Sequence, residues 1–330
     1  MPCFNAASTV GRAVRSIQQQ TFTDWQLIVV DDGSTDNSAD IVESMAAMDP
    51  RIHLIRSPHL GVVGASQRGA EEAKGAFFAR MDADDVSLPD RLAVQLEALR
   101  DDESLDAISC LVRFAGDPQS AGGYAHHVEW TNQLDTVEQI ALNRFIDLPV
   151  PHPTLMYRRT TIERHGGYRD GDFPEDYEMV LRWIAGGARI GKVSRTLYDW
   201  HDPPSRLSRN DPRYAMQAFH QCKAPYLAQA IVASGAGDRD LWIWGAGRPA
   251  RKCAKPLFSA WRQPFGYIDI DPAKIGRTLH GCPVVSPESL PPKGSAVIVA
   301  YVGTRGAGQN IRQDLVARGW VEGIDFWIAA

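Results

Sequence analysis

Short apolar runs alternate with helical segments through the first hundred residues of this chain. The sequence predicts strands at residues 25–30, 51–57 and 76–81, and helices at residues 10–20, 37–48 and 64–74. A continuous apolar run of this length is typical of a parallel strand that is buried on both faces. Because strands that alternate with helices build doubly wound sheets, the pattern predicts an α/β fold with a mostly parallel sheet flanked by helices.

Acidic side chains follow two of the predicted strands. Asp31 and Asp32 end the first apolar run, and Asp82, Asp84 and Asp85 follow the third. Such sheets bind ligands beyond the carboxyl ends of their strands, so we expect both acidic clusters to belong to one site. Neighbouring carboxylates repel one another, and a divalent cation such as Mg²⁺ or Mn²⁺, bound together with substrate phosphates, would stabilise them. The alternative is a solvated acidic turn before the next helix.

Length, charge and cysteine content restrict the class of protein. A chain of 330 residues has room for two domains at roughly 100–200 residues each. The net charge of −5 argues against a nucleic-acid partner, and five scattered cysteines without a Cys-x-x-Cys pair suit a reducing cytosol. No apolar run approaches the roughly 18 residues of a transmembrane helix and no signal peptide opens the chain, so we expect a soluble protein, at most attached to a membrane surface.

Several motifs occur in a fixed order over about the first 205 residues. They are Pro2-Cys3-Phe4-Asn5, residues 28–36, 61–75 and 79–89, His152-Pro153-Thr154, and residues 174–182, 198–201 and 205–208. Together these motifs resemble the family 2 glycosyltransferases, which are inverting enzymes that use nucleotide sugars and have a GT-A-type fold. An ordered set spread over most of a domain is far more specific than any single motif.

The resemblance implies roles for the acidic clusters. Asp32, with Asp31 beside it, resembles the carboxylate that binds the base of the donor, typically the imide N–H of uracil. Asp82 and Asp84 resemble the motif that positions the ribose and the metal, with Asp84 as the metal ligand. This assignment is chemically coherent, because a divalent ion on the diphosphate stabilises the charge that builds as the glycosyl bond breaks.

Further candidates lie outside these clusters. The other donor-binding candidates are Arg80, Gln67, His201 and Arg206. By the resemblance, His201 and Arg206 belong to a segment that closes on the diphosphate, and arginine suits phosphate geometry. A solvated loop is the alternative for the nearby Arg209, and the family often has Asn where Gln67 stands, which weakens that assignment. His152, between two prolines, either contacts acceptor or phosphate or is a buried structural histidine.

Glu175 and Asp176 open a predicted helix. Asp176 resembles the general base that accepts the proton of the acceptor hydroxyl, and Glu175 resembles the neighbour that orients it. The alternative is that both acids only stabilise the helix N-terminus through the helix dipole. The motifs upstream favour the catalytic role.

The chain departs from the family pattern at its start. Family members carry an apolar strand before the Pro-x-x-Asn segment, and no such strand precedes Pro2. Because that strand belongs near the centre of the sheet, its loss would leave its neighbours without ladder partners. We therefore expect the native start to lie upstream, or the chain to be a shortened form. Mass spectrometry that finds Met1 as the terminus of the native protein would overturn this expectation.

The pattern is weaker beyond residue 104. The sequence predicts a strand at residues 105–114, a loop at 116–123, a helix at 133–145, paired strands at 189–193 and 196–200, and a helical stretch at 212–234. Residues 234–238 are typical of a linker.

A second nucleotide-like pattern begins at residue 241. An apolar run leads into Gly245-Ala246-Gly247, which approximates the phosphate-binding turn G-x-G-x-x-G/A, and Asp269 ends the next predicted strand. This part resembles the small Rossmann-like domains fused to sugar acyltransferases and C-methyltransferases. Four cations share one face of the helix after the turn: Arg248, Arg251, Lys252 and Lys255. They contact a phosphate or form a solvated surface, and packing, dimerisation and docking to a partner enzyme are equally open roles for the domain.

The sequence thus predicts three regions. They are a glycosyltransferase domain over residues 1–210, apparently without its first strand, a helical connector over 211–238 and a Rossmann-like domain of unknown role over 239–330. The predicted activity is metal-dependent, inverting transfer of a sugar from a nucleoside diphosphate sugar, expected to be a UDP-sugar, to a hydroxyl of a glycan or glycolipid. The expected setting is surface polysaccharide assembly in the cytoplasm, at the inner face of the membrane.

Two alternatives come from other functional classes. A sugar nucleotidyltransferase would carry a glycine-rich, Arg-containing phosphate loop after its first strand, and Asn5-Ala6-Ala7-Ser8 offers none. A catalytically inactive scaffold that binds sugar nucleotides is the second alternative. The presence of Asp84 together with Asp176 counts against it, whereas the missing first strand keeps it open.

Overall fold

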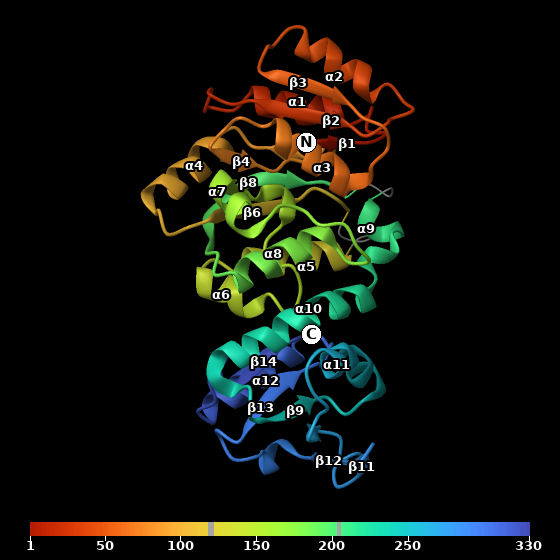
Figure 1. Cartoon of the computed structure of the whole chain (residues 1–330), viewed down its shortest axis with the longest axis vertical. Coiled ribbons are helices and arrows are strands. Elements are labelled where there is room, and N and C mark those ends of the chain that lie inside the picture. Colours follow the sequence, from red (N-terminus) through yellow and green to blue (C-terminus); the bar gives the residue numbers. More distant parts are fainter. Residues whose placement is uncertain (118–121, 203–205) are drawn as a thin grey trace. The chain divides into compact units, whose positions relative to one another are not determined.

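The computed structural model describes residues 1–117, 122–202 and 206–330, so the predicted loop at 116–123 and the motif at 205–208 lie partly outside the described residues. The chain forms two compact units, traced in Figure 1. The first unit comprises Met1–Ile140, Pro149–Asp170 and Gly186–Asn210, and the second comprises Ala141–Leu148, Gly171–Ala185 and Asp211–Ala330. The two short segments 141–148 and 171–185 therefore belong to the second unit, although segments of the first unit flank them in the sequence.

The first unit is an α/β structure built from strands and helices that alternate along much of the chain. Its strands are β1 (Pro2–Cys3), β2 (Leu27–Asp31), β3 (Ile52–Arg56), β4 (Phe77–Ala79), β5 (Val86–Ser87), β6 (Ala107–Phe114), β7 (Met156–Arg158) and β8 (Ile190–Trp200). Its helices are α1 (Val10–Gln18), α2 (Ser38–Ala46), α3 (Gly61–Glu72), α4 (Arg91–Asp101), α5 (Gly122–Asn132), α6 (Val137–Asn143, which continues into the second unit), α7 (Arg159–His165), α9 (Leu207–Asn210) and the 3₁₀ turn His152–Thr154.

The strands of this unit form two sheets. Strands β1, β2 and β3 pair in parallel, and every residue of β2 is buried, as the continuous apolar run predicted. Helix α1 packs one apolar face inward, with Val10, Ala13, Val14 and Ile17 buried, beside α2 (Figure 1). The second sheet has the order β4-β7-β6-β8-β5 and is mixed, because only its β6–β8 pair is parallel. The predicted α/β class is confirmed.

Two local predictions beyond residue 104 are wrong. The paired strands predicted at 189–193 and 196–200 form one continuous strand, β8, which pairs with β6 through register shifts next to Leu111. The bulge accommodates the extra residues of β8 without ending the ladder, so polar residues in its middle do not mark a turn. The helix predicted at 133–145 is shorter, at Val137–Asn143, and α5 precedes it where no helix was expected.

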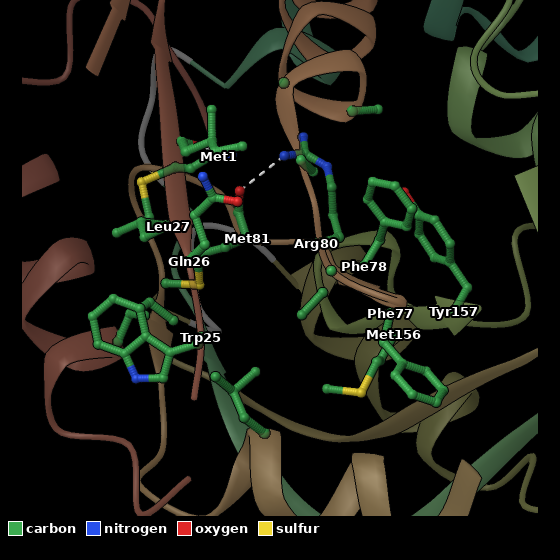
Figure 2. A pocket seen from close by; sticks show the side chains of 18 of the residues that line it. Met1, Trp25, Gln26, Leu27, Phe77, Phe78, Arg80, Met81, Met156 and Tyr157 are labelled. Carbon is green, nitrogen blue, oxygen red and sulfur yellow. Dashed lines mark hydrogen bonds between the residues drawn. The ribbon is translucent and has the colours of Figure 1, made fainter. Parts of the chain in front are cut away.

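A cavity of about 560 Å³ lies between the start of β2 and β4. Figure 2 shows Trp25 and Leu27 on one wall and Phe77 and Phe78 on the other. Strand β1, where the sequence had suggested no strand, is only two residues long and pairs with the last residues of β2. Among the described residues, β4 pairs only with β7, and Phe77, Phe78 and Ala79 of β4 line this cavity.

The second unit is built around a six-stranded sheet of order β11-β12-β10-β9-β13-β14, parallel except for the β11–β12 pair. Its strands are β9 (Asp240–Trp244), β10 (Gly266–Ile268), β11 (Thr278–Leu279), β12 (Cys282–Val285), β13 (Ala296–Ala300) and β14 (Phe326–Ile328). Its helices are α8 (Glu175–Ala185), α10 (Met216–Ile231), α11 (Arg248–Ala260) and α12 (Ala307–Ala317), with 3₁₀ turns Pro212–Tyr214 and Pro287–Ser289 and a π-type segment Val232–Ala236. Strand β13 is buried throughout, which is typical of a central parallel strand.

Membrane-spanning helices were not expected from the sequence. Within residues 1–117, 122–202 and 206–330, no helix combines the length and apolar character needed to cross a bilayer.

Lys223 on α10 gives the stability of the second unit a testable dependence on pH. Its Nζ is buried and donates to the carbonyl oxygens of Phe145 and Ala329, each at 2.8 Å. Burial lowers the pKa of this amine from 10.5 to about 8, so between these pH values the unfolded chain binds a proton that the folded chain lacks. Stability should therefore rise with pH in this window.

We expect the free energy of unfolding of the wild type to rise by about 3 kcal/mol, relative to that of Lys223→Met, between pH 8 and pH 10.5. Denaturant unfolding of both proteins across this range measures the difference. Other titrating groups cancel in the comparison, so a difference that does not change with pH would contradict the burial of a titrating amine.

Candidate active site

Three carboxylates gather directly after β4. Asp82, Asp84 and Asp85 each offer an oxygen within 4.8 Å of the others. Asp85 is almost fully buried; its Oδ1 accepts the backbone N–H of His201 at 2.7 Å, and its Oδ2 has no hydrogen-bond partner among the described residues. A buried carboxylate oxygen without a partner is costly, so this arrangement favours a bound cation over a solvated turn.

The electrostatics of the cluster also favour a cation. Burial and the negative charge of Asp82 raise the pKa of Asp84 to about 6, and burial together with Asp84 and Asp82 raises the pKa of Asp85 well above its usual value. All three side chains supply oxygen ligands, which suits a hard divalent ion such as Mg²⁺ or Mn²⁺. The residues present therefore fit the metal that the sequence predicted, with Asp85 as a third candidate ligand.

Two arginines contact this cluster. Arg80 is buried, and its Nη2 lies 2.6 Å from Oδ1 of Asp82. Burial alone would raise the pKa of Asp82, but the charge of Arg80 outweighs it and lowers that pKa. Arg12 on α1 donates to the backbone oxygen of Asp84 at 2.8 Å. Arg80 thus contacts the acidic cluster directly, whereas Arg12 had no sequence motif to mark it.

The two aspartates at the end of β2, Asp31 and Asp32, lie in different environments. Asp32 accepts the backbone N–H groups of Leu60 at 2.7 Å and Gly61 at 3.0 Å, and it thereby holds the start of α3. Among the described residues, the side chain of Asp31 accepts only the N–H of Ser34, at 3.3 Å, and its buried Oδ1 lacks a hydrogen-bond partner there. The geometry therefore favours Asp31 as the carboxylate with an oxygen available for a ligand.

An aromatic pair lies beside this acidic pair. The rings of Phe4 and His59 are 4.4 Å apart between centroids, and Nδ1 of His59 lies 2.9 Å from Oδ2 of Asp32. Phe4 is 48% exposed, which leaves part of an aromatic ring open to a ligand. Phe4 belongs to the opening motif, but neither residue was a predicted site residue, because their contact joins segments more than fifty positions apart.

His201 and Arg206 follow β8. Nδ1 of His201 lies 4.0 Å from Oδ1 of Asp85 and has no hydrogen-bond partner among the described residues. Burial, followed by the charge of Arg12, lowers the pKa of His201, which favours the neutral imidazole. Arg206 donates to the carbonyl of His201 at 3.1 Å and lies over the ring of Trp200. The nearby Arg209 forms an ion pair with Asp202, consistent with the loop alternative.

His152 and Gln67 both contact Tyr168. Nε2 of His152 lies 2.7 Å from the Tyr168 hydroxyl, and Nε2 of Gln67 donates to the Tyr168 carbonyl at 2.9 Å. Burial lowers the pKa of His152 to about 3, so the ring is neutral. These contacts favour the structural alternative for His152 and give Gln67 a role in holding α3 to the Tyr168 segment.

Glu175 and Asp176 lie in the second unit, at the start of α8. Glu175 is buried and accepts the hydroxyl of Tyr214 at 2.6 Å, and Glu178 on the same turn accepts the hydroxyl of Tyr226 at 2.6 Å. Asp176 is half-buried, and its Oδ1 accepts the N–H of Tyr177 at 2.7 Å. Of the three acids on this turn, Asp176 is thus the one that solvent reaches most readily.

Comparison with known proteins places these features in a family. The family model of Glycosyl transferase family 2 matches residues 1–166, which is half of the chain. Chondroitin synthase of Pasteurella multocida is 30% identical over 108 residues, which are 33% of this chain and 11% of that protein. The UDP-Glc:alpha-D-GlcNAc-diphosphoundecaprenol beta-1,3-glucosyltransferase WfgD of Escherichia coli is 33% identical over 100 residues, 30% of this chain and 39% of that protein. The chain thus matches less than half the length of either relative.

A solved structure extends the likeness to the fold. The crystal structure of S. aureus TarS 1-349, in complex with UDP-GlcNAc, superposes with a TM-score of 0.55 at 17% identity, covering 79% of this chain and 72% of that one. This likeness shows a fold of the GT-A type. The chain belongs to glycosyl transferase family 2. The family prediction is confirmed, whereas the likeness of the second unit to domains fused to sugar acyltransferases stays a prediction.

Proposed function

We propose that this chain transfers a sugar, with inversion, from a nucleoside diphosphate sugar to a hydroxyl of a glycan or lipid-linked acceptor, with a divalent metal as cofactor. The cluster of Asp82, Asp84 and Asp85 carries this proposal, because one buried and two half-buried carboxylates lie together and a buried oxygen of Asp85 has no partner in the described chain, so a cation would stabilise them. The names of the relatives, a chondroitin synthase and a glucosyltransferase that uses UDP-Glc and a lipid diphosphate acceptor, support a UDP-sugar donor and a role in surface polysaccharide assembly.

The proposed mechanism assigns each step to a side chain. Asp84, with Asp82 and Asp85, would hold the metal, which neutralises charge on the departing diphosphate when bound. Asp31 accepts the imide N–H of the base, since its Oδ1 is buried without a partner in the described chain. Asp176 takes the proton of the acceptor hydroxyl, whose oxygen bonds to the anomeric carbon as the bond from that carbon to the diphosphate oxygen breaks. Attack from the face opposite the leaving group inverts the anomeric centre.

Titration calorimetry of UDP and GDP, each with and without Mn²⁺, tests the donor and the metal together. We expect UDP to bind more tightly with Mn²⁺ than without it, and more tightly than GDP. Asp31→Asn should weaken UDP binding by about tenfold, because loss of a hydrogen bond to a charged group costs about 1.5–3 kcal/mol. UDP binding that ignores both Mn²⁺ and this substitution would contradict the proposed donor site.

Asp32→Asn is the matched control for that titration. This variant removes the charge that holds the backbone of Leu60 and Gly61, so it should lower the free energy of unfolding by about 2 kcal/mol. Asp31→Asn should leave stability nearly unchanged, because the side chain of Asp31 makes only one hydrogen bond, a long one, to the residues that the structure describes. The opposite pattern would exchange the roles of the two aspartates.

A further inference from the structure

Positive charge gathers in one part of the second unit. Residues 248–277 carry seven Lys or Arg and two Asp, although the chain as a whole has a net charge of −5. The two acids, Asp269 and Asp271, both pair with Lys274, at 3.2 and 3.3 Å. Within the described ranges, none of the other six cations pairs with a carboxylate: Arg248, Arg251, Lys252, Lys255, Arg262 and Arg277.

The charge distribution elsewhere in this unit is different. Five arginines outside residues 248–277 have acidic partners within 3.0 Å: Arg182, Arg213, Arg239, Arg312 and Arg318. An ordinary solvated surface intersperses both signs of charge in this way. The six cations without a carboxylate partner therefore form a local excess of positive charge.

Helix α11 presents most of this excess to solvent. Arg248, Lys252 and Lys255 are exposed, and their spacing of four and three residues places them on one face of the helix, over about 10 Å of its length. The opposite face packs into the unit through the buried Ala254 and Leu257. The cations thus lie on the side of α11 that points away from the core.

The segment after β10 extends this surface. Nη1 of Arg251 donates to Nε2 of His280 at 2.9 Å, which joins the hairpin of β11 and β12 to α11. Arg277 lies directly before β11, is exposed, and its side chain forms no hydrogen bond or ion pair with any described residue. We define the basic surface by its four exposed cations, Arg248, Lys252, Lys255 and Arg277.

The basic surface suits an extended anionic partner better than a small anion in a pocket. A cavity of about 650 Å³ lies in the same unit, but none of the four cations lines it. A nucleic acid is disfavoured, because the chain as a whole is acidic. A bilayer with anionic headgroups can neutralise all four cations at once, since the headgroups move freely in its plane.

We propose that the basic surface docks this protein on a membrane that contains anionic phospholipids. Each Lys or Arg near such a membrane strengthens binding by about fivefold. The acidic remainder of the chain does not prevent docking, because charges further away than about 8 Å are largely screened at physiological ionic strength. Docking requires neither donor nor metal, whose proposed ligands lie in the first unit.

Sedimentation with vesicles tests the docking of the full chain in EDTA, without donor or acceptor. We expect binding to vesicles of about one third phosphatidylglycerol in phosphatidylcholine at about 0.1 M salt. Vesicles of phosphatidylcholine alone should bind at least tenfold more weakly. Salt at about 0.5 M should release the protein from the anionic vesicles, because it shortens the range of the attraction.

Lys252→Glu/Lys255→Glu reverses two charges on the exposed face of α11, where no described contact is lost, so folding should be preserved. We expect binding to anionic vesicles to weaken by about 25-fold or more. Lys252→Arg/Lys255→Arg keeps the charge and should bind as the parent chain does. Arg15→Glu/Lys74→Glu makes the same change in net charge at exposed positions of the first unit and should also bind as the parent does.

Arg248→Glu/Arg277→Glu is a second, independent variant of the basic surface, and it should also weaken binding. Equal binding to neutral and anionic vesicles would overturn the proposal, as would unchanged binding of both Glu variants. Absence of binding to anionic vesicles at millimolar lipid would overturn it as well and would favour an acidic protein as the partner. The Mn²⁺-dependent titration of UDP should be the same in Lys252→Glu/Lys255→Glu and in the parent chain, so failure of docking is distinguishable from failure of the transferase proposal.

Discussion

Replacement of Asp84 by Asn is expected to lower kcat/KM of sugar transfer by about a thousandfold. The substitution keeps the shape of the side chain but removes the charged oxygen ligand at the centre of the acidic cluster, and stabilisation of a leaving diphosphate by a metal is worth several kcal/mol. Release of UDP from the donor, assayed across a range of Mn²⁺ concentrations, measures the loss. Full activity at any Mn²⁺ concentration would remove Asp84 from the metal site.

The free energy of unfolding of Asp84→Asn shows whether the Asp84 carboxylate serves the function or the fold. Burial and Asp82 raise the pKa of Asp84 from 3.8 to about 6, so at neutral pH the folded state holds a charge that it disfavours. Asp84→Asn should therefore raise the free energy of unfolding in EDTA by about 2–3 kcal/mol. Asp90→Asn is a control on the following surface turn, where the carboxylate pairs with Arg195 at 3.0 Å and should affect neither activity nor stability. A destabilised Asp84→Asn would indicate that this carboxylate serves the fold.

The parts of the fold that local sequence determines were predictable. The buried run of β2 and the amphipathic face of α1 each show the periodicity of their element, and both lie where the sequence placed them. Strand β8 was not predictable as one element, because its bulge is set by pairing with β6, far away in the chain. The assignment of residues 141–148 and 171–185 to the second unit likewise depends on packing, as in the contact of α8 with α10.

The candidate site also has features that the local sequence determines and features that depend on contacts between distant segments. Carboxylates at the ends of strands are visible in the sequence, and the structure brings Asp82, Asp84 and Asp85 together. Whether a carboxylate oxygen is available to a ligand depends on backbone groups from other parts of the chain. Both oxygens of Asp32 accept hydrogen bonds, from the N–H groups of Leu60 and Gly61. Motif order alone made Asp32 the leading candidate for base binding, whereas its surroundings favour its neighbour Asp31.

Replacement of Asp176 by Asn is expected to lower kcat by roughly 10²–10⁴-fold while leaving UDP binding unchanged, which is the range for loss of a general base. Among the acids on the first turn of α8, Glu175 and Glu178 are buried against tyrosine hydroxyls, whereas Asp176 is half-buried and can exchange a proton with a bound hydroxyl. Single-turnover rates with saturating donor and acceptor measure the chemical step.

Glu178→Gln is the matched control for this substitution. Glu178 lies 3.0 Å from Nε of Arg182 and accepts the Tyr226 hydroxyl, so its replacement should lower stability and leave the pH dependence of kcat unchanged. Asp176→Asn should instead abolish the acidic limb of the pH–rate profile, because the group whose protonation stops the reaction is gone. The prediction fails if the kcat of Asp176→Asn stays within an order of magnitude of the wild-type value and the acidic limb remains. In that case Asp176 would only stabilise the helix N-terminus, and another base would accept the proton of the acceptor hydroxyl.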